Sequence, residues 1–121
     1  MAKKIAKIII DGVIEKENDN YKQEWVLDTI ETLEEKKDVV GIIVYINSPG
    51  GAVFESDEVY EALLRYKEKT KKPVYAYFAS LAASGGYYIG CAADKIIANR
   101  NTLTGSIGVI AGRFVDLTEL M

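Results

Sequence analysis

The chain has 121 residues, of which 49% are hydrophobic and 27% are charged, and its formal net charge is -3. This length and composition predict one globular domain. The acidic balance argues against nucleic acid or an anionic membrane surface as a partner. No stretch reaches the roughly 20 apolar residues that cross a bilayer, so we expect a soluble chain without a membrane span.

Histidine is absent from the sequence and cysteine occurs once. Without histidine, the chain cannot build a Ser-His-Asp triad, a Cys-His pair or most zinc sites, and we predict neither a metal nor a cofactor. The single cysteine, Cys91, lies among small and apolar residues, which predicts a buried thiol. The lysine-rich run at residues 67–72 is expected at the end of a helix, where cations complement the helix dipole.

Hydrophobic periodicity predicts the secondary structure. A short apolar run that stops at the turn pair Asp11-Gly12 predicts the first strand. Val26, Ile30 and Leu33 recur at helical spacing and predict an amphipathic helix, and the β-branched run after it predicts a strand buried on both faces. The predicted elements, in chain order, are strand 5–10, helix 23–37, strand 39–46, helix 54–69, strand 73–78, helix 82–93, strand 95–98 and strand 107–110. Strands that alternate with helices predict a layered α/β fold with mainly parallel pairing.

Residues 47–51, Asn-Ser-Pro-Gly-Gly, connect the buried strand to the second predicted helix. Adjacent glycines adopt backbone angles that other residues avoid, and they let a ligand approach the main chain closely. Their amides, just before a helix, are well placed to receive an oxyanion. A tight strand-to-helix turn without a ligand also explains these residues, so the motif alone leaves both interpretations open.

A second small-residue stretch at residues 82–86, Ala-Ala-Ser-Gly-Gly, follows a predicted strand and opens a helix. A turn of this kind presents a nucleophilic serine at the positive end of the helix dipole. Here that serine is Ser84, and the amide of Gly85 would be a second oxyanion donor. The alternative is that Ser84 only caps the helix, which is a common role of serine.

The order of these motifs resembles signal peptide peptidase A and, more loosely, the Clp protease subunit and the crotonase-like superfamily. The similarity extends from Ile5 through residues 104–109, Thr-Gly-Ser-Ile-Gly-Val, a segment that resembles signal peptide peptidase A in particular. The resemblance implies a Clp protease/crotonase-like layered α/β fold of repeated β-β-α units with a mainly parallel sheet. Residues 1–121 would then form a single, truncated catalytic-core domain.

By this resemblance, Ser84 is the acylating nucleophile of a Ser-Lys dyad. The oxyanion hole is assigned to Gly50, Gly51 and Gly85, with Gly50 shaping the turn. A serine hydroxyl is a weak nucleophile until a base takes its proton, and a lysine serves as base only when it is neutral. In the family, that lysine lies farther downstream than this chain extends, so we expect the chain to be nearly inactive alone.

Other residues near the expected site have less certain roles. Ser106 corresponds to a family hydroxyl that helps to hold the base lysine, although a simple turn serine would fit the same position. Val53, Leu81 and Tyr87 are candidates for a substrate pocket, and core residues would have the same composition. Lys95 is a poor base, because Asp94 precedes it and would keep it charged.

The resemblance implies a serine endopeptidase that cleaves hydrophobic, signal-peptide-like substrates. It further implies a homo-oligomer, and a parent protein at the extracytoplasmic face of a bacterial membrane. Two alternatives remain. One is a non-catalytic assembly module, which the missing lysine favours. The other is a crotonase-like enzyme that binds acyl-CoA, which would need basic groups for the nucleotide phosphates near Gly51, where the sequence has no such cluster.

Overall fold

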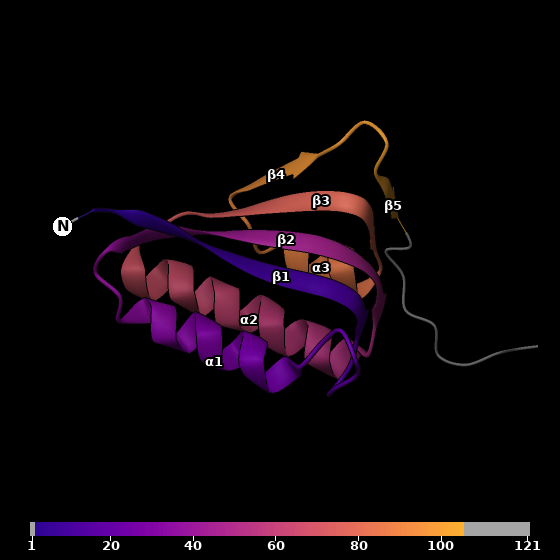
Figure 1. The fold of residues 1–121 in the computed structure, drawn as a ribbon, viewed down its shortest axis with the longest axis horizontal. Coiled ribbons are helices and arrows are strands. Elements are labelled where there is room, and N and C mark those ends of the chain that lie inside the picture. Colours follow the sequence, from indigo (N-terminus) through magenta and orange to yellow (C-terminus); the bar gives the residue numbers. More distant parts are fainter. Residues whose placement is uncertain (1, 106–121) are drawn as a thin grey trace, which may run out of the picture.

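The computed structural model describes residues 2–105. Ser106 and the strand predicted over residues 107–110 therefore lie outside the described residues. The elements in chain order are β1 (Lys4–Ile14), α1 (Gln23–Glu34), β2 (Val39–Gly51), α2 (Val53–Thr70), β3 (Val74–Ala83), α3 (Gly85–Gly90), β4 (Lys95–Ala98) and β5 (Leu103–Gly105) (Figure 1).

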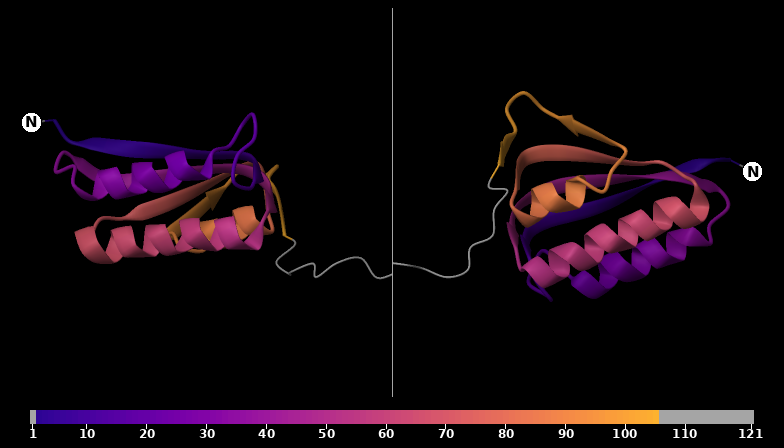
Figure 2. Two further views of the ribbon diagram at one scale, coloured as in Figure 1. Left: turned by 90° about the horizontal axis from the view of Figure 1, so that it is seen from below. Right: turned by 180° about the vertical axis from the view of Figure 1, so that it is seen from behind.

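The strands of the described region form one parallel sheet. The order is β1-β2-β3-β4, and β5 pairs with the later part of β3. The helices α1, α2 and α3 all pack on one face of this sheet (Figure 1, Figure 2). The predicted α/β class with parallel pairing is confirmed.

The core lies between the sheet and the helices. Successive side chains of a strand point to opposite faces, and alternate residues of β1, β2 and β3 face the helices. Burying one branched aliphatic side chain contributes about 1.5–3 kcal/mol, so this layer supplies most of the apolar stabilisation. Its members in the strands include Ile8, Ile10, Ile42, Val44, Ile46, Val74, Ala76 and Phe78.

The opposite face of the sheet has no helix over it in the described region. The strand register aligns Ile9, Tyr45, Tyr77 and Ile97 in one row across β1 to β4. The rings of Tyr45 and Tyr77 stack with their centroids 5.7 Å apart, while Ile9 remains 55% exposed. One side of the sheet is therefore a core and the other an apolar surface.

The largest differences from the predicted boundaries concern the ends of the first three strands. The Asp11-Gly12 pair does not end β1, because Gly12, with φ 78°, allows a register shift within the strand. β2 continues through the Asn-Ser-Pro-Gly-Gly motif to Gly51. β3 continues to Ala83, so the predicted helix over residues 82–93 is reduced to α3.

The end of α1, the last two strands and Cys91 can also be compared with the predictions. α1 ends at Glu34 rather than three residues later, and β4 occupies the predicted residues. β5 was not predicted. The prediction for Cys91 was wrong: the thiol is exposed, because α3 ends before it and turns it away from the core.

The lysine-rich run lies at the end of α2, as expected. Lys67 Nζ is 3.1 Å from Asp94 Oδ1 and Lys69 Nζ is 3.1 Å from Glu34 Oε1. Lys71 follows as the C-cap in the left-handed conformation, with φ 59°. The ion pairs of Lys67 and Lys69 link the end of α2 to neighbouring elements.

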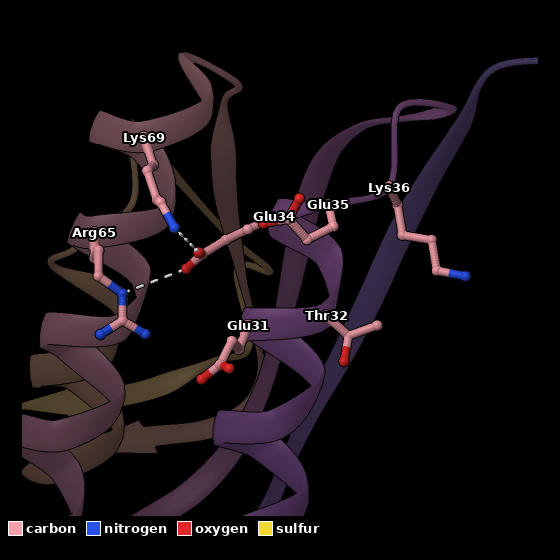
Figure 3. Close-up of a pocket in the computed structure, with 7 residues that line it drawn as sticks. All are labelled: Glu31, Thr32, Glu34, Glu35, Lys36, Arg65 and Lys69. Atoms are coloured by element: carbon pink, nitrogen blue, oxygen red, sulfur yellow. Dashed lines mark hydrogen bonds and ion pairs between the residues drawn. The ribbon is translucent and has the colours of Figure 1, made fainter.

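A charge cluster joins the C-terminal ends of α1 and α2 (Figure 3). Arg65 Nε lies 3.4 Å from Glu34 Oε2, on the opposite side of the carboxylate from Lys69. The Glu34 side chain is only 4% exposed. Burial by itself would raise the pKa of Glu34, but the hydrogen bonds and charges of Lys69 and Arg65 outweigh it and lower the pKa below its ordinary value.

We expect Glu34→Gln to lower the free energy of unfolding at pH 7 by about 0.5–1 kcal/mol, because both cations are largely exposed and screened. A lowered pKa in the folded state stabilises the fold above the ordinary pKa, and this stabilisation is lost as the pH falls. Urea unfolding at pH 7 and at pH 3 measures the effect. The difference between the native chain and the variant should shrink at pH 3. Glu35→Gln, at the exposed neighbouring position, is the matched control, and an equal loss there would contradict this role for Glu34.

Candidate active site

The site forms where β2 and β3 end side by side. Between the paired residues Ile46–Phe78 and Ser48–Ala82, β2 advances by two positions whereas β3 advances by four. β3 therefore carries two extra residues, which bend the strand just before Ser84. Bulges of this kind re-aim a strand next to a functional site.

Ser84 connects β3 to α3 in a strained conformation. Its φ of 52° and ψ of -119° lie outside the regions that non-glycine residues favour. Strain of this kind costs about 1–3 kcal/mol and persists only when the surroundings impose it. The Ser84 side chain makes no capping hydrogen bond to α3, so the helix-cap interpretation is wrong and the hydroxyl is not held by its own helix.

Gly50 brings the main chain of β2 against this turn. A Cβ atom at Gly50 would lie 2.7 Å from the Ser84 Cβ and 2.7 Å from the Gly85 nitrogen. Gly50 also has φ 99°, which side-chain-bearing residues rarely adopt. The two motifs predicted to form one site are therefore in direct contact.

The amides around Ser84 differ in their partners. The Gly50 amide donates to Ser48 Oγ at 3.0 Å, and the Ser84 amide donates to the Gly105 carbonyl at 3.1 Å. The Ala52 amide donates to the Ile14 carbonyl of β1 at 2.8 Å. Gly51, which follows Gly50, lies against the backbone of Ile14 in β1.

The short helix α3 is fixed against α2. The Tyr88 hydroxyl donates to Asp57 Oδ1 at 2.6 Å, and the Tyr88 ring stacks on Tyr60 at 4.6 Å. The hydrogen bond to Asp57 is the main cause that raises the pKa of Tyr88 to about 12. At the start of α3, a Cβ at Gly85 would lie 2.2 Å from Ser56 Oγ, so a larger residue there would displace the Ser56 hydroxyl. These contacts set the direction in which α3 leaves Ser84.

The candidate pocket residues lie in different environments. Val53 begins α2 and is 62% exposed, and its neighbour Phe54 is 68% exposed. Leu81 is half-buried within the bulged part of β3. Tyr87 packs against the core, with its ring 6.0 Å from that of Phe78. Val53 and Phe54 thus present apolar surface immediately after the glycine motif.

Lys95 lies at the wrong end of the sheet to act on Ser84. It pairs with Tyr75 near the start of β3, nine positions before Ser84. Tyr75 pairs with Ile43 of β2, seven residues before Gly50 at the Ser84 turn, so at about 3.3 Å per residue in a parallel strand the separation is on the order of 20–25 Å. Within residues 2–105, no group of acidic or cysteine side chains is arranged to hold a metal ion, and no helix has the length and hydropathy to cross a bilayer.

The fold has known structural relatives. The 1510-N membrane-bound stomatin-specific protease, solved as a lysine-to-alanine variant with a substrate peptide, superposes with a TM-score of 0.73 at 24% identity, covering 92% of this chain and 48% of that one. ClpP1 from Listeria monocytogenes superposes with a TM-score of 0.58 at 27% identity, covering 72% of this chain and 46% of that one. The described residues thus have the Clp protease-like fold.

Sequence comparison finds similar proteases. Residues 66–121 match the model of peptidase family S49. A protein from Enterococcus faecium, provisionally named signal peptide peptidase SppA, is 40% identical over 115 residues, covering 89% of this chain and 33% of the relative. The chloroplastic serine protease SPPA of Arabidopsis thaliana is 42% identical over 91 residues, covering 75% of this chain and 13% of the relative. The resemblance to signal peptide peptidase A is confirmed, and residues 66–121 carry the match to peptidase family S49. It spans a third or less of the length of these curated relatives.

Contact at Gly50 gives a first test of the site. Gly50→Ala should lower the free energy of unfolding by at least about 3 kcal/mol, because the new methyl adds a clash with the Ser84 turn to a backbone strain of about 1–3 kcal/mol. Gly105→Ala is the matched control: Gly105 has φ 145°, and a Cβ there would meet no atom of residues 2–105 within 4 Å. Chemical denaturation of both variants measures the difference. Equal losses in the two variants would show that Gly50 does not touch the turn.

Proposed function

We propose that this chain is the nucleophile-bearing part of a serine peptidase of the signal peptide peptidase A type. The observation that carries the proposal is the conformation of Ser84, which is held at a strained strand-to-helix turn and touches the backbone of the glycine motif, while its side chain makes no hydrogen bond to its own helix. A nucleophile elbow needs this combination, because the hydroxyl must stand clear of its helix with backbone donors beside it.

In the proposed reaction, Ser84 Oγ attacks the carbonyl carbon of the scissile peptide bond. The hydroxyl proton passes to a neutral lysine, which then protonates the leaving amine as the C–N bond breaks. Water hydrolyses the resulting acyl-enzyme and regenerates the hydroxyl. The sequence contains no histidine that could act as the base, and by the family resemblance we assign this role to a lysine in the part of the parent protein beyond the 121 residues.

We assign the amides of Gly51 and Gly85 as the hydrogen-bond donors that stabilise the oxyanion of the tetrahedral intermediate. The Gly50 amide already donates to Ser48 Oγ, so Gly50 serves the site through its shape rather than as a donor. The assignment of the Gly51 amide rests on the resemblance to signal peptide peptidase A. The Gly85 amide opens α3, where the first amides of a helix have no partner within the helix. Gly85 follows Ser84 directly, and Gly51 follows Gly50, which contacts the Ser84 turn.

Hydrophobic, signal-peptide-like segments are the proposed substrates. Val53 and Phe54 supply exposed apolar surface beside the glycine motif, and Leu81 and Tyr87 would contribute the walls nearest to Ser84. Such substrates would place the parent protein at the extracytoplasmic face of a bacterial membrane. The apolar sheet face around Tyr45 and Tyr77 is compatible with association between copies. Ser106, by the family resemblance, would help to hold the base lysine.

Covalent labelling with a fluorophosphonate tests the nucleophile in the full-length protein that contains this chain. We expect one adduct, located at Ser84 by peptide mass spectrometry, and no adduct in Ser84→Ala. Ser80→Ala, which changes an exposed serine of the same strand, should label at the normal rate. An adduct at another serine, or none in the folded full-length protein, would rule out the proposal.

Peptide hydrolysis tests the assignment of the base. The 121-residue chain should cleave a fluorogenic hydrophobic peptide at least about 10³-fold more slowly than the full-length protein, because the residual catalysis would come from binding and oxyanion stabilisation alone. The measurement is kcat/KM for both proteins at the same pH. Comparable values would place the base within the 121 residues.

A further inference from the structure

The two extra residues in β3 create a local problem of hydrogen bonding. Between Phe78 and Ala82, the regular pairing of β3 with β2 is interrupted, and buried backbone amides without partners are costly. β1 and β2 have a second irregularity at the same level, between the pairs Asp11–Asn47 and Val13–Gly50. Both irregularities meet at Asn47.

The Asn47 side chain bridges the two irregularities. Its Oδ1 accepts a hydrogen bond from the Leu81 amide at 3.2 Å, inside the bulged part of β3. Its Nδ2 donates to Asp11 Oδ1 of β1 at 3.3 Å. One planar amide thus supplies an acceptor on one side and a donor on the other, a combination that neither aspartate at neutral pH nor an aliphatic residue offers.

The far side of the bulge is held by two threonines. Thr102 Oγ1 donates to the Phe78 and Ala79 carbonyls at 3.0 and 2.7 Å, and Thr104 Oγ1 donates to the Ala82 carbonyl. On the β2 side, the Leu81 amide is held by Asn47. Side chains on both edges therefore replace the missing strand pairing. Ser84 follows this segment directly, so the position of its hydroxyl depends on where the bulge is fixed.

We propose that Asn47 is a positioning residue for Ser84: by joining Asp11 to the Leu81 amide, it fixes the β3 bulge and thereby places the Ser84 hydroxyl beside the Gly51 and Gly85 amides. The catalytic consequence rests on the proposed function, whereas the hydrogen-bonding arrangement does not. Asn47 touches neither substrate nor reacting atoms in this role. It acts through the main chain of β3.

A reciprocal exchange tests this arrangement. Asn47→Asp loses the donor and sets two carboxylates against each other, whereas Asp11→Asn combined with Asn47→Asp restores the pair in reverse. In the double variant, the amide of the new asparagine donates to the new carboxylate, which still accepts from Leu81. Asn101→Asp, an exposed change of the same type, is the control for added charge.

Two measurements distinguish the positioning role of Asn47 from the proposed role of Ser84 as nucleophile. Fluorophosphonate labelling of Ser84 in the full-length protein should slow by about 10–100-fold in Asn47→Asp, since misplacing a reacting group by about 1 Å costs up to 10²-fold, and should return to within about threefold of normal in the double variant. Amide hydrogen exchange at Leu81, measured by NMR on the 121-residue chain, should accelerate in Asn47→Asp and recover in the double variant.

The possible outcomes test the positioning role of Asn47 and the nucleophilic role of Ser84 separately. Recovery of the exchange rate and of the labelling rate in the double variant supports the positioning role. A double variant that is no better folded or no faster labelled than Asn47→Asp overturns it, as does an Asn47→Asp chain whose exchange and labelling are unchanged. Absence of labelling in the unaltered full-length protein would reject Ser84 as the nucleophile. The exchange rate of the Leu81 amide would still show whether Asn47 holds that amide.

Discussion

The arrangement depends on one close approach of two backbones. At Gly50, the main chain of β2 touches the turn at Ser84 with no side chain between them. This contact requires a glycine, a strand that bends and a serine that accepts an unfavourable backbone conformation. Each of these features is unfavourable or unusual alone. Together they put a hydroxyl and backbone amides into one small space, which side chains alone would not achieve.

The regular elements follow from the sequence. The helical spacing of Val26, Ile30 and Leu33 places α1, and all three side chains are buried against the sheet. The β-branched run that begins at Val39 places β2 in the centre of the sheet between two neighbours. These patterns are reliable because burial on one face imposes them directly. The contact between the two glycine-containing motifs was implied by the resemblance to signal peptide peptidase A.

The irregular elements do not follow from local patterns. Gly12 has the composition of a turn, yet it forms a bulge because β2 continues alongside and supplies partners for the chain beyond it. β3 likewise continues through its small residues, because hydrogen bonds from the side chains of Asn47, Thr102 and Thr104 hold the segment where its pairing with β2 is interrupted. The exposure of Cys91 depends on where α3 ends. Asn47 itself carried a weak signal: a polar residue at the end of a buried strand, whose two partners only the tertiary structure reveals.

Parallel pairing throughout the described sheet also constrains how the chain acquires its structure. Antiparallel strands can meet through a tight hairpin, but parallel strands need a crossover, and each neighbouring pair from β1 to β3 is separated by a helix. The chain must therefore close long loops before these strand contacts contribute any stability, which slows folding. During that interval, the isoleucine-rich segments of β1 and β2 are unpaired. Synthesis at low temperature or with chaperones should favour recovery of the native chain over aggregation.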